Sequence, residues 1–160
     1  MKTKLLFSFC FFCFCPSFFA QEKKEIKKNK IKSITVTQTA NGKTLSDGKT
    51  IYDESGEVIE EVQYTKEGGL KKITKFKLNN LGKVVEEEEY NAKKILVEKR
   101  ILKYTADGKK SEEQVFNSQQ KLIKKHSYKY DSQGIKTERV TVDDTGKIKL
   151  IKKYNCQFNN

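Results

Sequence analysis

The residues of this chain that could catalyse a reaction are few and scattered. His126 is the only histidine, and a catalytic histidine needs a nucleophile or an orienting acid beside it. The pairing derived below places Glu112 opposite His126, so the two could serve as the acid–base pair of a small envelope hydrolase. The same repeat position is held elsewhere by ordinary polar or basic residues, which favours a structural role for the histidine: Thr74, Arg100 and Lys152.

Four consecutive glutamates, Glu86 to Glu89, are the nearest thing to a paired-carboxylate site. Hydrolytic carboxylates must converge across a cleft, about 5–10 Å apart. In a strand, alternation sends Glu86 and Glu88 to one face and Glu87 and Glu89 to the other. Asp53 and Asp131 belong to turns, where the Asp side chain bonds nearby backbone groups. We therefore expect no catalytic residue and a protein that is not an enzyme.

Cys156 is the single cysteine outside the first twenty residues. One cysteine cannot build an internal disulfide framework, and one histidine with one cysteine does not make a metal site. We expect no metal and no cofactor. The repeat places Cys156 where other copies have an aromatic residue, so it fits there as a small hydrophobe. It is also a candidate for an intermolecular disulfide.

The first twenty residues have the order of a secretory signal peptide: Lys2 and Lys4, then an apolar run, then Pro16, then Ala20 before polar sequence. The apolar run is shorter than the roughly 20 residues of a membrane span. We expect residues 1–20 to be removed on export. The protein would then be periplasmic, or extracellular at the cell surface, with no membrane span in its mature chain.

The mature chain is predicted to be strongly basic. Of 33 basic residues, Lys2 and Lys4 are removed with the signal segment. The remaining 31 basic and 21 acidic residues give a net charge of +10. Residues 21–30 hold five lysines and a single apolar side chain. Such a segment buries too little surface to order itself. We expect a lysine-rich flexible tail over residues 21–30 and one domain over residues 31–160.

A period of 26 residues runs through this domain. Glycines recur at that step, and so does an aromatic or apolar residue four positions earlier. A period in the 20–50 range is typical of repeat proteins. We expect these positions to be structural rather than catalytic: Tyr52, Gly56, Gly82, Tyr104, Gly108, Tyr130 and Gly134. The units lie near residues 31–51, 52–77, 78–103, 104–129 and 130–155.

Each unit contains two stretches that alternate apolar and polar residues, which predicts two short strands. Between the stretches lie glycine-containing clusters that suit hairpin turns. Folding each hairpin about its midpoint pairs Tyr64 with Leu70, Glu86 with Arg100 and Glu112 with His126. The prediction is an all-β fold: an antiparallel up-and-down meander of about ten strands, as a rolled single sheet or an open barrel.

The alternation predicts one apolar face and one face rich in lysine. An apolar face of this extent exceeds what soluble monomers usually expose. The sheet could roll onto itself, or two copies could pack face to face as a homodimer. The sequence leaves both open. The lysines could attract an anionic envelope lipid or polysaccharide, or they could simply keep the sheets from aggregating. With no aromatic residue expected on the lysine face, we expect no nucleic-acid partner.

The segment Tyr128-Lys-Tyr130-Asp131-Ser-Gln-Gly134 resembles the Tyr-x-Tyr-Asp-x-x-Gly signature of YD repeats, the units of Rhs-like proteins. Tyr52-Asp53-Glu-Ser-Gly56 matches its second half, and two weaker copies lie between. The resemblance implies β-hairpin sheets and, in small exported members, a surface or periplasmic protein. From it we expect an exported, non-enzymatic β-repeat protein that serves as a binding or structural module, with an unidentified protein or an anionic envelope component as its partner.

Overall fold

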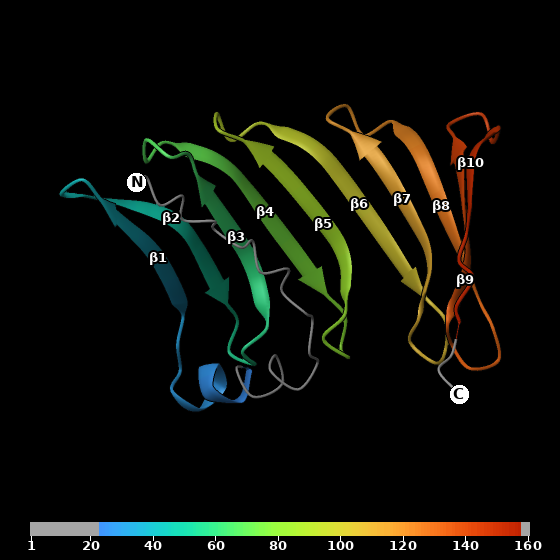
Figure 1. The fold of residues 1–160 in the computed structure, drawn as a ribbon, viewed down its shortest axis with the longest axis horizontal. Coiled ribbons are helices and arrows are strands. Elements are labelled where there is room, and N and C mark those ends of the chain that lie inside the picture. The colour runs from blue at the N-terminus through green and yellow to red at the C-terminus, as the bar shows by residue number, and fades with distance from the viewer. Residues whose placement is uncertain (1–22, 158–160) are drawn as a thin grey trace, which may run out of the picture.

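The computed structural model describes residues 23–157, which form one antiparallel sheet of ten strands. The predicted signal peptide, residues 1–20, lies outside the described residues. The strands lie in the sheet in the same order as along the chain (Figure 1). This confirms the predicted all-β meander. The strands are β1 (Ser33–Ala40), β2 (Lys43–Tyr52), β3 (Val58–Tyr64), β4 (Leu70–Leu78), β5 (Val84–Asn91), β6 (Leu96–Tyr104), β7 (Lys110–Asn117), β8 (Leu122–Tyr130), β9 (Lys136–Asp143) and β10 (Ile148–Lys153).

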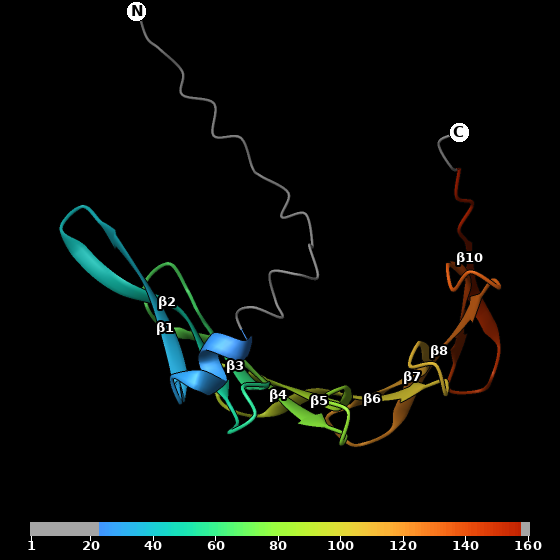
Figure 2. The same ribbon diagram turned by 90° about the horizontal axis from the view of Figure 1, so that it is seen from below.

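The sheet curves without closing. Its two ends bend toward the same side, and β1 and β10 lie at opposite ends of the arc (Figure 2). β1 is paired only with β2, and β10 only with β9. The sheet is therefore rolled and open, as predicted. Within residues 23–157, no helix has the length and apolar character that crossing a membrane requires.

Eight of the nine hairpin turns share one design, in which a tight turn is followed by a residue with positive φ. In the turn at Thr65, the Gly68 N–H donates to the Thr65 carbonyl at 2.9 Å, and the Thr65 N–H donates to the Gly69 carbonyl at 2.7 Å. The first residue is always Asp, Asn or Thr, whose side-chain oxygen accepts from the N–H four positions on. The repeat thus rests on these short polar side chains as much as on glycine.

The predicted pairing is right beside each turn and wrong by one residue beyond it. Tyr64 lies opposite Leu70 as expected, but a β-bulge follows, and Glu60 faces Lys75 rather than Thr74. The same shift places Arg100 opposite Glu87 instead of Glu86. The extra residue is Lys71, between Leu70 and Lys72, which lies in the strand beyond the three-residue loop that ends at Gly68.

The bulges divide the apolar residues between both faces, so the predicted single apolar face is wrong. Cross-strand partners lie on the same face. Arg100 shares its face, here called the Arg100 face, with Glu87 and Val115. Its neighbour Lys99 shares the opposite face, the Lys99 face, with Glu88 and Phe116. The Arg100 face carries Phe76, Leu102, Tyr104, Tyr128 and Tyr130, and the Lys99 face carries Ile73, Tyr90, Ile101, Phe116 and Val142.

A single layer buries little. Among the described residues the buried hydrophobic side chains are Ile26, Val62, Leu102 and Val115. Val115 alone is fully enclosed, at 0% exposure. Most other apolar side chains are half-buried by their neighbours in the sheet. Cross-strand contacts and backbone ladders therefore hold this fold together more than a central core does.

The flexible tail expected over residues 21–30 is, from residue 23 on, a short helix over residues 23–28. The helix lies beside the turn between β2 and β3 (Figure 1). Ile26 is only 3% exposed, and Gly56 in that turn is buried. A Cβ atom added to Gly56 would lie 2.9 Å from the Lys23 carbonyl oxygen and 3.5 Å from the Ile26 side chain. The helix was not predicted because its single apolar residue, Ile26, gives no periodic pattern.

Candidate functional site

Lysine and tyrosine side chains gather on the Arg100 face near the turns that join even-numbered to odd-numbered strands. They come from both strands and turns, and the 26-residue period repeats part of their arrangement. We call this group the lysine–tyrosine row. Its members are Lys83, Tyr104, Lys109, Lys110, Tyr128, Tyr130, Lys136 and Tyr154.

In this row each ammonium group lies over a tyrosine ring. The Nζ atom of Lys83 is 5.2 Å from the ring centre of Tyr104. One repeat later, Lys109 stands 5.7 Å from the ring of Tyr130. Lys83 and Lys109 each directly follow the glycine of a turn. The turn geometry thus aims both lysines at the ring of the next hairpin, at a distance where cation–π attraction operates.

At the C-terminal end of the row, one lysine lies over two tyrosine rings. Lys136 lies 4.5 Å from the ring of Tyr154 and 5.9 Å from that of Tyr128. Tyr154 follows β10 and is held in place by its backbone N–H, which donates to the Thr137 carbonyl at 2.9 Å. The Nζ atom of Lys136 thus lies within cation–π range of two rings at once.

Hydrogen bonds fix the tyrosine rings. The Tyr104 hydroxyl donates to the Val84 carbonyl at 2.7 Å, and the Tyr130 hydroxyl donates to the Lys110 carbonyl at 2.8 Å. Burial raises the pKa of both hydroxyls above the ordinary value. The rings therefore stay neutral at physiological pH and present a fixed aromatic surface.

Both faces contain lysines that carboxylates neutralise. On the Lys99 face, Lys103 is paired with Glu112 at 2.9 Å and Lys129 with Glu138 at 2.7 Å. In the lysine–tyrosine row, Lys109 and Lys110 have carboxylate partners. The ion pairs within residues 23–157 include none for Lys83 or Lys136. These two ammonium groups contact rings or a carbonyl instead, which leaves their charge uncompensated.

An ion-pair cluster lies beside the row at the centre of the Arg100 face. The Arg100 guanidinium contacts Glu87 at 3.1 Å and lies 4.0 Å from Glu113. Burial would raise the pKa of the Glu113 carboxyl, but hydrogen bonds from Lys110 and Tyr128 hold it below its usual range. Each carboxylate in the cluster has a basic partner. The cluster therefore links strands β5, β6, β7 and β8 and has a structural role.

The candidate acid–base pair does not exist. Glu112 lies opposite Ser127 on the Lys99 face, and His126 lies opposite Glu113 on the Arg100 face. The bulge beside the β7–β8 turn shifted the pairing by one residue. His126 Nδ1 is instead 2.8 Å from the Thr141 hydroxyl. Burial is the main cause that lowers the pKa of His126, so the ring is neutral at pH 7.

The four glutamates separate between the faces as predicted. Glu86 and Glu88 both contact Lys99, at 2.9 and 3.3 Å. Glu87 contacts Arg100, and Glu89 contacts Lys72 at 2.8 Å. Within residues 23–157, no group of three or more His, Cys, Asp or Glu side chains has the arrangement of a metal site.

The residues predicted to be structural lie in the hairpin turns and at strand ends. Gly56, Gly82, Gly108 and Gly134 all have positive φ, between 72° and 82°. Tyr104 and Tyr130 make the carbonyl hydrogen bonds given above, and Tyr52 ends β2, with its N–H bonded to Lys32. Cys156 is exposed and free, so its role in an intermolecular disulfide stays a prediction.

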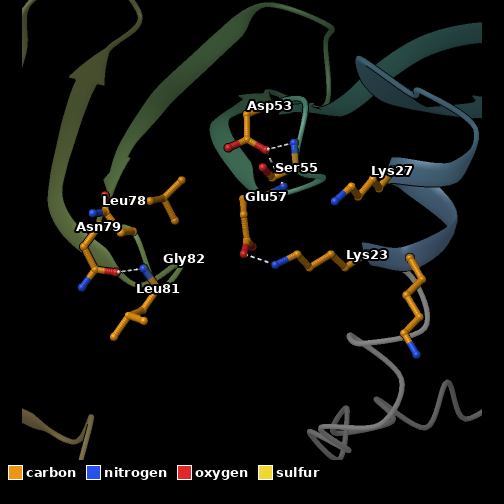
Figure 3. Close-up of a pocket in the computed structure, with 11 residues that line it drawn as sticks. Lys23, Lys27, Asp53, Ser55, Glu57, Leu78, Asn79, Leu81 and Gly82 are labelled. Carbon is orange, nitrogen blue, oxygen red and sulfur yellow. Dashed lines mark hydrogen bonds and ion pairs between the residues drawn. The ribbon is translucent and has the colours of Figure 1, made fainter. Parts of the chain in front are cut away.

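A hollow lies between the N-terminal helix and the adjoining turns (Figure 3). Lysines of the helix face Asp53 and Glu57 across it, and the turn of Asn79 to Gly82 forms its other wall. Lys23 forms an ion pair with Glu57. Its side chain therefore joins the helix to the β2–β3 turn.

No protein-family model matches the chain, and no curated protein matches it. Among solved structures, it is similar to TarM, including an S. aureus TarM mutant in complex with Fondaparinux, alpha-GlcNAc-glycerol and UDP. The TarM structure without the mutation gives a TM-score of 0.33 at 12% identity, over 78% of this chain and 22% of TarM. The GtfA/B complex bound to UDP and GlcNAc gives 0.21, at 14% identity over 75% and 24%.

A protein of unknown function from Bacteroides fragilis gives a TM-score of 0.16 at 14% identity, over 79% of this chain and 96% of that one. This chain thus spans less than a quarter of the TarM and GtfA/B chains. Likenesses this weak support no argument about function.

The lysine–tyrosine row was not predicted from the sequence, because the predicted register placed tyrosines and lysines on opposite faces. The single-residue shift at each bulge brings them together. A usable signal was present, since Lys83 and Lys109 follow a turn glycine at the same step of 26 residues. The tyrosines that they contact, Tyr104 and Tyr130, recur at that step as well.

Proposed function

We propose that this protein is exported and acts, without catalysing a reaction, as a binding module at the cell envelope or cell surface. The observation that supports this is the lysine–tyrosine row on an open sheet. It combines fixed aromatic rings with ammonium groups that no carboxylate neutralises at Lys83 and Lys136. The signal-like first segment supports the location, and the resemblance to YD repeats supports a non-enzymatic role.

The chemistry of the row favours an anionic envelope polymer or lipid as the ligand. Uncompensated lysines attract phosphate or carboxylate groups, and the neighbouring rings offer flat apolar surface to the rest of such a ligand. The row also extends along several hairpins, which suits a repeating polymer. A purely structural role, in which lysines only prevent aggregation, would not require rings and cations to alternate.

The experiment compares two triple variants with the same change in charge. Lys83, Lys109 and Lys136 are replaced by Gln in the first. Lys77, Lys103 and Lys129, which lie on the Lys99 face at steps of 26 residues, are replaced by Gln in the matched control. Binding to vesicles with anionic headgroups and to an acidic polysaccharide is measured at low and at physiological salt.

Each lysine near an anionic surface contributes about 1 kcal/mol, so we expect the first variant to bind at least ~10-fold more weakly than the control. Affinity should fall with rising salt, because exposed charges are screened. Equal losses in both variants would mean that only net charge matters. Absence of binding by the parent protein to either probe would contradict the proposed ligand class.

A further inference from the structure

One edge of the sheet lacks the features that usually prevent association. β1 reads Ser-Ile-Thr-Val-Thr-Gln-Thr-Ala and contains no charged residue, although 34% of the chain is charged. Every other strand contains at least one charged side chain. Free edges in soluble proteins are normally protected by Lys, Pro or a bulge. The opposite edge, β10, has such protection in Lys149, Lys152 and Lys153.

The outer backbone groups of β1 can be identified from its pairing with β2. The Tyr52 N–H donates to the Lys32 carbonyl at 3.0 Å, so Lys32 directs its backbone groups toward β2. At the other end, Asn41 and Gly42 both have positive φ and form a two-residue turn, which pairs Ala40 with Lys43. Backbone groups alternate in direction along a strand. The residues with outward N–H and C=O groups are therefore Ser33, Thr35, Thr37 and Thr39.

β1 is itself regular along its whole length. The register shifts between Val36 and Thr37, but the extra residue, Asp47, belongs to β2. All eight residues of β1 are exposed, and Val36 is 54% accessible. The edge is thus an uninterrupted template for another strand.

We propose that β1 pairs antiparallel with β1 of a second copy, around a two-fold axis at Val36. In this register Thr35 faces Thr37 and Ser33 faces Thr39, so every outward N–H and C=O group of both strands finds a partner. Shifting either strand by two residues would leave some of them without one. The two ten-stranded sheets then form one continuous sheet.

Side chains and charge favour this partner over others. The hydroxyl side chains form facing pairs, and Thr–Thr and Thr–Ser pairs are favourable across antiparallel strands. The same chemistry is already present in β1–β2, where the Thr39 and Thr44 hydroxyls are 2.7 Å apart. Pairing β10 with β10 would instead bring three lysines of each copy together, and like charges across strands are destabilising.

Edge pairing of one strand buries less than the ~1,200 Å² of a standard stable interface. We therefore expect a dimer that dissociates in the micromolar range rather than a permanent one. This inference is independent of the proposed ligand, because β1 lies at the other end of the sheet from β6 to β10, where most of the lysine–tyrosine row lies (Figure 1).

The test is sedimentation velocity of the chain purified after export, from about 1 to 200 μM, with reductant present to exclude a disulfide through Cys156. The blocking variant is Thr35→Pro, which removes an outward N–H and leaves the bonds to β2 intact. The matched control is Ile151→Pro. Tyr154 donates to Thr137, and alternation from there makes the Ile151 N–H an outward group on the β10 edge.

We expect the parent and Ile151→Pro to dimerise with rising concentration and Thr35→Pro to remain monomeric. A parent that is monomeric over the whole range would overturn the proposal. So would a dimer that persists in Thr35→Pro and is lost in Ile151→Pro. Thr35→Lys repeats the test without a proline, in case the first variant fails to fold.

Amide hydrogen exchange gives a second measurement on the unmodified chain. The amides of Ser33, Thr35, Thr37 and Thr39 should exchange at least ~10-fold more slowly at the highest concentration than at the lowest, because pairing protects them. Exchange at these four amides that does not depend on concentration would contradict the proposed edge.

Discussion

At the scale of single residues, two turns break the glycine rule of the others. Lys94 and Gln120 have φ of 60° and 61°, at the position that glycine holds in six other turns. A left-handed conformation costs a non-glycine residue roughly 1–2 kcal/mol. The cost is tolerated because Asn91 and Asn117 fix these turns with side-chain hydrogen bonds to two backbone N–H groups each.

Replacing Lys94 or Gln120 by Gly should therefore stabilise the protein. We expect each change to raise the free energy of unfolding by about 0.5–1 kcal/mol, measured by urea denaturation. Glycine relieves the backbone strain of positive φ, but its greater entropy in the unfolded chain offsets part of that stabilisation. Lys93→Gly, one residue earlier and without positive φ, is the control and should not stabilise. A destabilised Lys94→Gly protein would contradict this account of the two turns.

His126 is expected to make stability depend on pH. Its pKa in the folded state is lowered from 6.5, chiefly by burial. The unfolded chain therefore binds the proton more readily, so stability is full above pH 6.5 and declines as pH falls through the lower folded pKa. We expect urea denaturation between pH 8 and pH 5 to show this decline, and His126→Gln to show less of it.

The same histidine can be observed directly, since it is the only one in the chain. An NMR titration of its ring should give a midpoint below 6.5 in the folded protein. A midpoint at or above that value would mean that the ring is accessible to water and that Thr141 does not hold it.

At the scale of elements, the predictions were right where the repeat acts locally. The 26-residue step located the hairpins, and Tyr64 opposite Leu70 was found from symmetry alone. The predictions failed beyond the turn because a mirror cannot represent a bulge. The extra residue, Lys71, lies beyond the loop that ends at Gly68, so the turn residues did not reveal it.

The same register error explains why the two faces and the lysine–tyrosine row were predicted wrongly. Once the register moved by one residue, Glu112 and His126 separated onto opposite faces, and Lys83 came to lie over Tyr104. The N-terminal helix is a different case. Its docking rests on Ile26 and on a backbone contact at Gly56, which no local pattern of residues 23–28 reveals.

The helix makes a testable contribution at Gly56. Gly56→Ala would force a Cβ atom to 2.9 Å from the Lys23 carbonyl oxygen, whereas nothing lies within 4 Å of the equivalent atom at Gly146. Both glycines have similar positive φ, 79° and 84°. Gly146→Ala therefore measures the backbone cost alone, about 1–2 kcal/mol, and we expect Gly56→Ala to cost more.

Urea denaturation of the two variants isolates the contribution of helix docking as their difference. Equal losses of stability would show that the helix does not pack on the β2–β3 turn. The difference should also disappear in a background where Ile26 is changed to Asp, because the helix is then undocked.

At the scale of the whole molecule, the open sheet explains why function is sought on its surface. Each hairpin contacts only its neighbours, as in other repeat proteins, so stability accumulates from nearest-neighbour contacts. Val115, near the centre, is the one side chain among residues 23–157 with no exposure. Such an architecture offers two broad faces and two edges, and it places the lysine–tyrosine row and β1 in separate parts of the surface.

The most direct test of the lysine–tyrosine row is an NMR titration of the isotope-labelled protein with an acidic polysaccharide. Ligand binding at the row predicts chemical-shift changes centred on Lys83, Tyr104, Lys109, Tyr130 and Lys136, on the Arg100 face, and their reversal by added salt. Changes centred instead on Lys77, Lys103 and Lys129 of the Lys99 face, or no change at saturating ligand, would contradict it.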